Sequence, residues 1–442
     1  MSKATPDATT SVPARHVAAV VAGNALEFYD FITYSFFAVY IGKAFFPSNV
    51  PSASLLASLA TFGVGFVTRP IGAFVIGGMG DRVGRKPAML LCFSLMGISI
   101  TGLALTPSHA SIGVAAPLLV IFFRLLQGFA LGGDVGPTTA FLLEAAPANR
   151  RGFYTAFQSW SQSVATLGSG LVGFALSSLL SDKQLQDFGW RIAFLIGAVI
   201  IPFGLWLRRD LPETFRAVDA GAGKGERVVL RPYAWVAFLG LILLANGTIG
   251  TYIRNYITTY AIATLHMPAN VAFAATIVVG VTGIAFGLFS GILADRFGRK
   301  PVMVLFGTLN LLSILPCFYV ISHYRTTATL LGATTVLSTL AGMSISPIIT
   351  SMTESLPAAI RSGGVAVIYA VAITIFGGTT QYAVTWLIRA TGNPLAPAWY
   401  WTVSAAIALA AMTAMRETLP RELRKPQTWN AVAQPEAVSL DD

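Results

Sequence analysis

Long apolar runs, each close to the length that crosses a bilayer, recur along the whole chain. A membrane-spanning α-helix needs about 20 such residues to cross roughly 30 Å of hydrocarbon. Only 11% of the 442 residues are charged, whereas a typical soluble domain has about 25%. The runs therefore predict a protein built largely from membrane-spanning helices, and they exclude a water-soluble globular domain.

Turn residues and charges divide the apolar runs into twelve predicted helices. The predicted helices are 16–42, 53–79, 88–107, 115–145, 151–181, 188–208, 232–262, 270–294, 301–322, 327–356, 360–391 and 397–416. We expect two six-helix bundles, at 16–208 and 232–416, joined by a polar linker at 209–231. Residues 1–15 and 417–442 are polar and are interpreted as tails.

The basic residues are distributed unevenly between the predicted loops. Most of the 29 Lys and Arg residues fall on one side of the membrane when both termini are placed in the cytoplasm. Cytoplasmic loops are the ones that retain Lys and Arg, so this bias predicts cytoplasmic termini. It also explains the net charge of +10 without a nucleic-acid partner, and the lipid bilayer is the expected surrounding.

A charged motif occurs twice. The stretch from Gly80 to Pro87 (Gly-Asp-Arg-Val-Gly-Arg-Lys-Pro) returns from Ala294 to Pro301 (Ala-Asp-Arg-Phe-Gly-Arg-Lys-Pro), in each case between the second and third predicted helix of a half. Glu144 and Glu354 form a second matched pair, after the fourth helix of each half. Two matches in register predict two homologous halves. Transporters built in this way bind substrate near the membrane midplane, at the interface of the halves.

These motifs resemble those of the major facilitator superfamily. Within it, several stretches resemble the metabolite:proton symporter family, among them Gly23-Asn-Ala-Leu-Glu-Phe-Tyr-Asp30, Arg69-Pro-Ile-Gly72 and Arg124-Leu-Leu-Gln-Gly128. The stretch from Ala145 to Leu176 most resembles the citrate and tricarballylate carriers of that family. The resemblance implies an all-α membrane protein of twelve transmembrane helices in two pseudo-symmetric six-helix bundles. It also implies a transporter of the bacterial inner membrane, not an enzyme.

The resemblance further implies that the repeated cytoplasmic loop latches one conformation of the transporter. A glycine suits the sharp turn in this loop, because a positive φ is cheap only for glycine. The alternative is that the loop only sets the membrane topology. The candidate gating residues are Gly80, Asp81, Arg82, Gly84, Arg85, Glu144, Asp295, Arg296, Gly298, Arg299 and Glu354.

Charges inside predicted spans are the sharpest functional signal, because each costs about 2.5–3.5 kcal/mol at a helix centre on insertion scales. Asn24, Glu27, Asp30 and Tyr34 are three or four residues apart, which places them along one face of the first helix. Burial and a neighbouring carboxylate both favour the protonated form of a carboxyl group. Glu27 and Asp30 are thus candidates for proton coupling, and structural pairing with an arginine is the alternative.

Arg124 and Gln127 share a face of the fourth predicted helix, and Asp134 lies further along it. The resemblance implies that Arg124 takes part in proton coupling, although an arginine does not itself release the proton. We expect it to pair with Asp30, Glu27 or an anionic substrate, the alternative being a structural tie between helices. The candidate proton-coupling residues are Glu27, Asp30, Arg124 and Asp134.

Other polar residues in the spans are candidates for substrate contacts. Arg254 is not a residue that the family resemblance accounts for, but a cation near the passage favours an anion. Arg69 has two open interpretations, a functional cation or a side chain that extends toward the membrane surface. The candidate substrate-binding residues are Asn24, Tyr34, Arg124, Gln127, Gln158, Gln162, Arg254, Asn255 and Gln381.

Together these features predict a proton-coupled symporter that imports an organic anion, most of all citrate or a related di- or tricarboxylate. The alternatives are another substrate of the same family (a 2-oxo acid, shikimate, betaine or proline) and, more remotely, a non-transporting membrane sensor. The sequence contains no phosphate-binding loop of the Gly-x-x-x-x-Gly-Lys-Ser/Thr type, and its histidines are too scattered for a metal site. We expect no cofactor and a monomer.

Overall fold

The computed structural model describes residues 14–82, 85–144, 151–209, 233–356 and 367–418. We call residues 14–209 the N-terminal half and residues 233–418 the C-terminal half. The N-terminal half contains α1 (Ala14–Phe36), α2 (Ala38–Phe45), α3 (Pro51–Val64), α4 (Arg69–Arg82), α5 (Arg85–Leu105), α6 (His109–Ile112), α7 (Ala115–Glu144), α8 (Arg151–Leu179), α9 (Asp182–Gln184), the π-helix η2 (Leu185–Gly189) and α10 (Trp190–Arg209).

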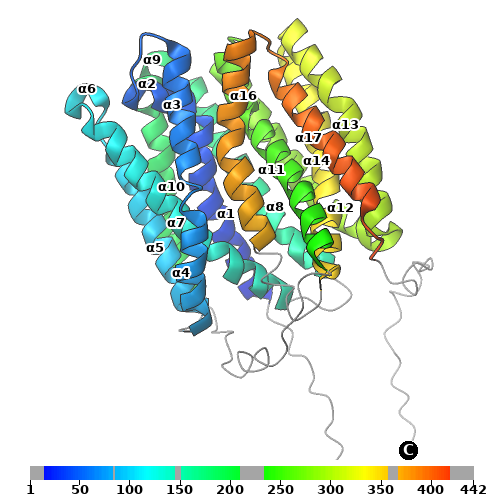
Figure 1. Ribbon diagram of the computed structural model, residues 1–442. Helices are drawn as coiled ribbons and strands as arrows, with labels where there is room; N and C mark the ends of the chain where they lie inside the picture. The colour runs from blue at the N-terminus through cyan, green and yellow to red at the C-terminus, as the bar shows by residue number, and fades with distance from the viewer. Residues whose placement is uncertain (1–13, 83–84, 145–150, 210–232, 357–366, 419–442) are drawn as a thin grey trace, which may run out of the picture.

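Long helices likewise account for most of the C-terminal half. They are α11 (Ala234–Ala263), α12 (Ala269–Phe297), α13 (Arg299–Tyr324), α14 (Thr327–Glu354), the π-helix η4 (Ile373–Gly377), α16 (Gly378–Thr391) and α17 (Ala396–Ala414). In Figure 1 the two halves stand side by side with their long helices running in similar directions, and α16 lies next to α3.

The helices follow the predicted order, with local departures. The span expected at 53–79 is two helices, α3 and α4, with a break between Val64 and Arg69. Pro70 has no N–H to continue the helical ladder, and the break lies just before it. The span expected at 16–42 is interrupted at Phe37, and the span expected at 360–391 contains the π-helix η4. A π-turn of this kind often marks a functional site.

Seven helical segments in the described residues are long and apolar enough to cross a membrane. They are Ser52–Ile76, Ala115–Gly133, Ala234–Ala263, Ala269–Phe297, Arg299–Tyr324, Thr327–Met352 and Val367–Thr391. The other five predicted spans are also helical, in α1, α5, α8, α10 and α17. Both α1 and α8 carry polar residues that are buried between helices, such as Asp30 and Ser161, and these residues lower their hydropathy without facing lipid.

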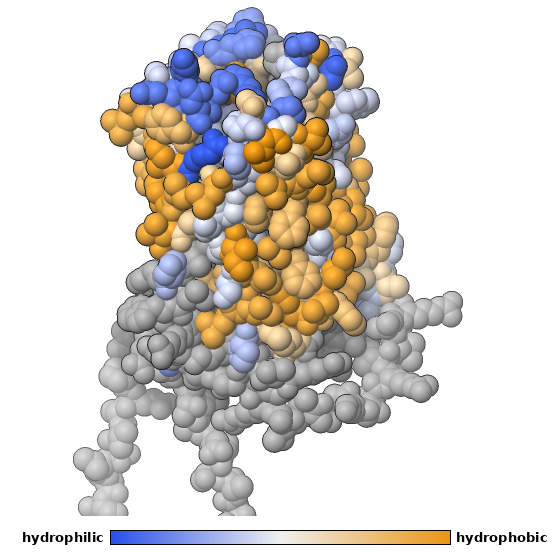
Figure 2. All heavy atoms as spheres, turned by 90° about the vertical axis from the view of Figure 1, so that its left-hand side faces the viewer, coloured by the Kyte–Doolittle hydropathy of each residue, from blue (hydrophilic) through white to orange (hydrophobic). Residues whose placement is uncertain are grey.

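The outer surface of the molecule fits a bilayer. On the face shown in Figure 2, hydrophobic residues form a broad belt and hydrophilic residues gather at one end. Exposed apolar side chains such as Phe74, Leu118 and Val199 contribute to the outer surface of the N-terminal half. Because lipid is as apolar as these side chains, close packing and small residues, rather than the hydrophobic effect, hold the helices together.

Small residues bring the halves together along their shared interface. A methyl group added at Gly280 of α12 would lie 2.6 Å from backbone atoms of Leu167 in α8, and one at Gly63 of α3 would lie 2.4 Å from the carbonyl oxygen of Gly378 in α16. Helices pack this closely only where a Cβ is absent. The two halves are therefore in close contact at two places, where α8 meets α12 and where α3 meets α16.

Candidate functional site

The predicted polar face of α1 lies inside the molecule. Asn24, Glu27, Asp30 and Tyr34 are each no more than 2% exposed. Asn24 Nδ2 donates a hydrogen bond of 2.6 Å to Ser161 Oγ in α8, so the start of this face is used for packing between helices. Further along α1, Asp30 faces α7 and Tyr34 faces α3.

Asp30 is connected to Arg124 through one amide side chain. Gln127 Nε2 donates a hydrogen bond to Asp30 Oδ2, and Arg124 Nη1 donates one to Gln127 Oε1. None of the ion pairs among the described residues joins Asp30 and Arg124 directly, and Asp30 Oδ1 has no hydrogen-bond partner among those residues. The two opposite charges are thus held in one buried network, with a neutral group between them.

Aromatic rings enclose the Arg124 guanidinium. Its carbon lies 4.7 Å from the ring centre of Phe31, 4.5 Å from that of Tyr34 and 5.0 Å from that of Phe62, and Nη2 donates a hydrogen bond of 3.4 Å to the Phe62 carbonyl. Such cation–π contacts stabilise a desolvated cation. Arg124 is therefore held inside the protein and does not extend toward the membrane surface.

A close crossing of α7 with the α3–α4 break places this network. Methyl groups added at Gly128 and Gly132 of α7 would lie 1.6 Å from the Gly65 carbonyl oxygen and 2.1 Å from the Arg69 carbonyl oxygen. Thr68 Oγ1 also donates a 2.7 Å hydrogen bond to the Leu125 carbonyl. Helices approach this closely only where a Cβ is absent, and the crossing sets Arg69 near Arg124.

The two halves meet beside this network through a hydrogen-bonded pair. Gln381 in α16 donates to Ser35 Oγ in α1 at 2.6 Å and to the Tyr252 carbonyl at 3.2 Å, while Thr259 Oγ1 donates to the Ser35 carbonyl at 3.3 Å. The Tyr252 ring of α11 packs edge-on against Phe66 with centres 5.5 Å apart. Gln381, predicted as a substrate contact, is used in this structure to join the halves.

The remaining predicted substrate residues are dispersed. Arg254 donates to the Gly250 carbonyl and to Thr251 Oγ1, both at 3.1 Å and both on its own helix. Within the described part of the chain, this side chain forms neither a hydrogen bond nor an ion pair with Asp30, Gln127 or Arg124. Asn255 is buried in α11. Gln158 and Gln162 are half-buried in α8, close to the start of the α1 polar face.

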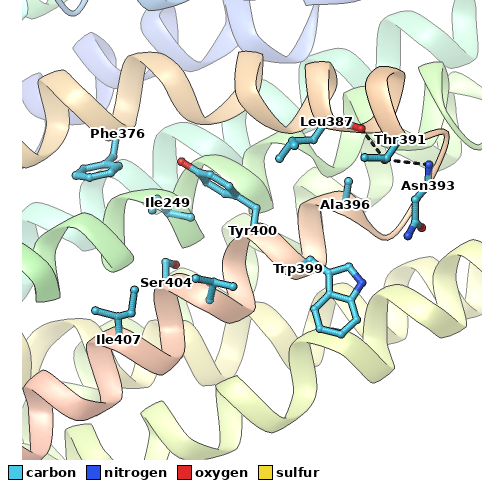
Figure 3. Close-up of a pocket in the computed structure, with 11 residues that line it drawn as sticks. Ile249, Phe376, Leu387, Thr391, Asn393, Ala396, Trp399, Tyr400, Ser404 and Ile407 are labelled. Atoms are coloured by element: carbon cyan, nitrogen blue, oxygen red, sulfur yellow. Dashed lines mark hydrogen bonds between the residues drawn. The ribbon is translucent and has the colours of Figure 1, made fainter.

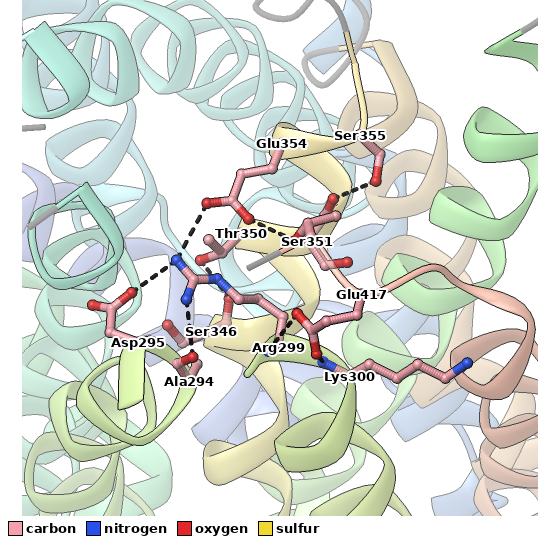
Figure 4. A network of polar contacts seen from close by, with 11 residues as sticks. Ala294, Asp295, Arg299, Lys300, Ser346, Thr350, Ser351, Glu354, Ser355 and Glu417 are labelled. Carbon is pink, nitrogen blue, oxygen red and sulfur yellow. Dashed lines mark hydrogen bonds and ion pairs between the residues drawn. The ribbon is translucent and has the colours of Figure 1, made fainter. Parts of the chain in front are cut away.

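The repeated motif of the C-terminal half forms a polar network at the α12–α13 turn (Figure 4). Arg299 is 2.9 Å from Asp295 and 3.2 Å from Glu354. Glu417, just after α17, accepts hydrogen bonds from the backbone N–H groups of Arg299 and Lys300 at 3.1 and 3.0 Å. One arginine therefore ties together α12, α13 and α14, and a carboxylate caps the N-terminus of α13.

The structure also describes two other predicted gating residues of this motif, Gly298 and Arg296. Gly298 has φ = 104°, the positive value expected of the loop glycine. Arg296 is exposed, with its guanidinium carbon 5.3 Å from the Phe297 ring centre. Several predicted residues lie outside what the structure describes, at least in their side chains: Gly80, Asp81, Arg82, Gly84, Arg85, Asp134 and Glu144.

A well-formed pocket of the described residues lies elsewhere. It is a groove of about 480 Å³ between α11, η4, α16 and α17, and Figure 3 shows Trp399, Tyr400 and Ile407 along it. Trp399 and Ile407 are about half exposed, so the groove opens on the apolar outer surface. It contains none of the predicted substrate residues and is not a candidate transport site.

Comparison with known proteins identifies the class. Residues 20–372 match the family described as the Major Facilitator Superfamily, and the chain belongs to this family. A structure of a D-xylose–proton symporter aligns with a TM-score of 0.74 at 19% identity, covering 92% of this chain and 98% of the other. The chain thus has the predicted all-α major facilitator fold, with twelve transmembrane helices in two related six-helix bundles.

Sequence relatives narrow the class to metabolite–proton symporters, as the motifs predicted. A citrate–proton symporter of Klebsiella pneumoniae is 37% identical, covering 88% of each chain. An α-ketoglutarate permease of Escherichia coli is 34% identical (90% and 94% covered), and a proline/betaine transporter of Salmonella typhimurium is 31% identical (92% and 84%). The chain is therefore a multi-pass membrane transporter and not an enzyme.

Three parts of this site were not predicted as functional residues. Arg69 was left with two interpretations, and the enclosing rings Phe31, Phe62, Phe66 and Tyr252 were not assigned. The charge of Arg69 within an apolar run was visible, but burial and extension to the surface give the same sequence signal. Glu417 was assigned to a tail, because nothing in the sequence links it to a turn 118 residues away.

Proposed function

We propose that this protein is a proton-coupled symporter that imports an organic anion, most of all citrate or a related di- or tricarboxylate, by alternating access. The observation that carries the proposal is the buried link from Asp30 through Gln127 to Arg124, beside the contact between the halves. The named activity of the Klebsiella relative, citrate–proton symport, supports the same substrate class.

The link couples a proton to an anion by electrostatics. When Asp30 is ionised, its negative charge compensates Arg124 through the Gln127 amide. When Asp30 takes up a proton, the guanidinium remains charged and its compensation is lost, so an anion is attracted to the site. Proton binding and anion binding then favour each other, and by linkage the coupling is reciprocal.

The energetics require such coupling. Moving one charge across 100 mV corresponds to about 2.3 kcal/mol, so a trivalent anion that enters an inside-negative cell opposes about 7 kcal/mol. Protons that travel with the anion cancel its charge and add the free energy of the pH gradient. In this proposal Asp30 carries a coupled proton, and Glu27 and Asp134 are further candidates on α1 and α7.

The aromatic rings favour an anion over a betaine-like substrate. A quaternary ammonium group is bound by the faces of aromatic side chains. Here the rings of Phe31, Phe62 and Tyr34 already face the Arg124 guanidinium, and Phe66 faces that of Arg69. Cations of the protein occupy these faces, which leaves positive charge for an anionic ligand. Proline, betaine, 2-oxo acids and shikimate remain the competing substrates of the test.

Further parts of the proposal concern residues and topology. In other conformations of the transport cycle, six polar residues of α1, α8 and α11 are proposed to reach the substrate: Asn24, Tyr34, Gln158, Gln162, Arg254 and Asn255. The motif around Arg299 is proposed to latch one conformation of the transporter. The protein is proposed to be a monomer in the bacterial inner membrane, with cytoplasmic termini, bundles at 16–208 and 232–416 and a cytoplasmic linker between them.

The test is uptake by the purified protein in liposomes with an imposed pH gradient, inside alkaline. Labelled citrate is compared with 2-oxoglutarate, shikimate, proline and betaine. The proposal predicts gradient-driven accumulation of citrate that collapses when a protonophore is added. Accumulation of betaine or proline alone, or uptake insensitive to the pH gradient, contradicts it.

A further inference from the structure

Arg69 is a buried cation whose donors are only partly used. It is 6% exposed, and its Nε and Nη2 have no hydrogen-bond partner among the described residues. The ion pairs formed by those residues do not include it. The guanidinium carbon lies 4.4 Å from the Phe31 ring centre and 4.1 Å from the Phe66 ring centre. The Tyr252 side chain of the C-terminal half is a hydrogen-bond partner of Arg69.

Nε and Nη2 of this buried guanidinium lack an acceptor among the described residues. Burying a charge is costly unless it is both paired and hydrogen-bonded. Aromatic faces compensate part of that cost, but they accept no conventional N–H hydrogen bond. The planar fork of an arginine matches the two oxygens of a carboxylate. The unused donors of Arg69 therefore fit an anionic ligand that is present in only part of the transport cycle.

Arg69 also lies at the interface of the two halves, where transporters built from two related halves bind their substrates. The same Phe31 ring lies 4.7 Å from the Arg124 guanidinium carbon, so both cations adjoin one aromatic side chain. Tyr252, from the C-terminal half, packs edge-on against the Phe66 ring that supports Arg69. The unpaired donors thus lie at the interface of the halves, one ring away from the proposed proton-coupling network.

We infer that Arg69 binds a carboxylate of the transported anion and is the second cation of the substrate site, beside Arg124. This inference rests on the proposed function and deepens it. One guanidinium serves one carboxylate, so two arginines around Phe31 select a ligand with at least two carboxylates. The cationic pair then distinguishes di- and tricarboxylates from monocarboxylates and zwitterions, which contain fewer groups for the arginines to bind.

The test uses citrate, 3-hydroxyglutarate and 3-hydroxybutyrate, acids that lose one carboxylate at each step, with the full-length protein in liposomes. In the wild type, KM is expected to rise at each loss. Arg69→Gln is expected to raise the KM for citrate roughly 10- to 100-fold. In this variant, one of the two increases in KM that accompany the loss of a carboxylate should disappear. Arg69→Lys, which retains the charge without the fork, is expected to show a smaller rise. Arg389→Gln, on the exposed end of α16, is the control.

The outcomes separate the inference from the proposed function. A common rise in KM for all three acids indicates a structural role and overturns the inference, as does an unchanged KM in Arg69→Gln. If Arg69→Gln does not elute as a monodisperse protein, Arg69→Lys decides by the same comparison. If the wild-type protein takes up none of the acids, the proposed function is overturned as well. If the wild-type protein takes up the acids and Arg69→Gln shows the same increases in KM along the series, only the role of Arg69 is overturned.

Discussion

Asp30 and Arg124, opposite charges buried on neighbouring helices, are joined through the amide of Gln127 and not by a direct ion pair. A direct pair would hold both charges tightly and would oppose protonation of the carboxylate. The amide relays hydrogen bonding while keeping the charges apart. This arrangement suits a carboxylate that must gain and lose a proton during each transport cycle.

The bridge itself is testable by Gln127→Leu, a change of similar volume. It leaves Asp30 Oδ2 and Arg124 Nη1 without these hydrogen bonds, and each buried group that loses its partner costs about 1–3 kcal/mol. We expect a lower unfolding temperature and at least about a tenfold loss of citrate uptake, one decade being 1.4 kcal/mol. Gln186→Leu, at an exposed hydrogen bond to Lys43, is the control, and equal effects of both changes would count against the bridge.

The contact between Ser35 and Gln381 is expected to bias the conformation of the halves. Ser35→Ala removes a hydrogen bond between the halves that is worth about 0.5–1.5 kcal/mol, so conformations in which α1 and α16 separate should become more populated. Distances between spin labels on these helices measure the shift. Ser404→Ala, which removes a 2.9 Å bond to Asn246 inside the C-terminal half, should leave the distances unchanged. A shift of the same size in that control would contradict the prediction.

The glycine contact between α3 and α16 is expected to be sensitive to a single methyl group. Gly63→Ala places a Cβ 2.4 Å from a backbone carbonyl of the other half, so the halves cannot approach as they do here and uptake should fall by tenfold or more. At Gly342, a Cβ would meet nothing within 4 Å. Uptake by Gly342→Ala at the wild-type level, beside a strong loss in Gly63→Ala, is the predicted result; full activity of Gly63→Ala would refute it.

Arg299 and Arg296 occupy the same motif but have different surroundings. Arg299 is 6% exposed and binds two carboxylates, whereas Arg296 is exposed. Arg299→Gln should slow transport several-fold and lower the unfolding temperature, because it leaves Asp295 and Glu354 without their cation, while Arg296→Gln should do neither. If the motif only sets topology, the two variants will behave alike.

The order of the helices could be predicted because apolar length and loop charges are local signals. The repeated motif also marked the α12–α13 turn correctly, including the glycine with positive φ at Gly298. The break at Phe37 was missed because it lies in a run that remains apolar. The break before Arg69 was missed because the apolar run resumes after Pro70, although that proline was a local signal for it. Hydropathy does not report where a helix bends.

The connections of the site were only partly predictable. Spacing along α1 grouped Glu27 and Asp30, but the choice of Gln127 as the bridge depends on how α7 is rotated by its glycine crossing with Gly65. The inter-half bond of Ser35 joins residues 346 positions apart, and no local pattern encodes that pairing. Long-range partners follow from packing, which a single sequence does not display.

The measurement that tests the central claim most directly compares two assays of Asp30→Asn in liposomes: citrate accumulation driven by a pH gradient, and exchange of labelled for unlabelled citrate without a gradient. The account predicts that accumulation and the accompanying proton influx are lost while exchange persists, because the asparagine side chain at position 30 is permanently neutral. Asp187→Asn, at an exposed position, should retain both activities. Proton-driven accumulation by Asp30→Asn at the wild-type level would contradict the account.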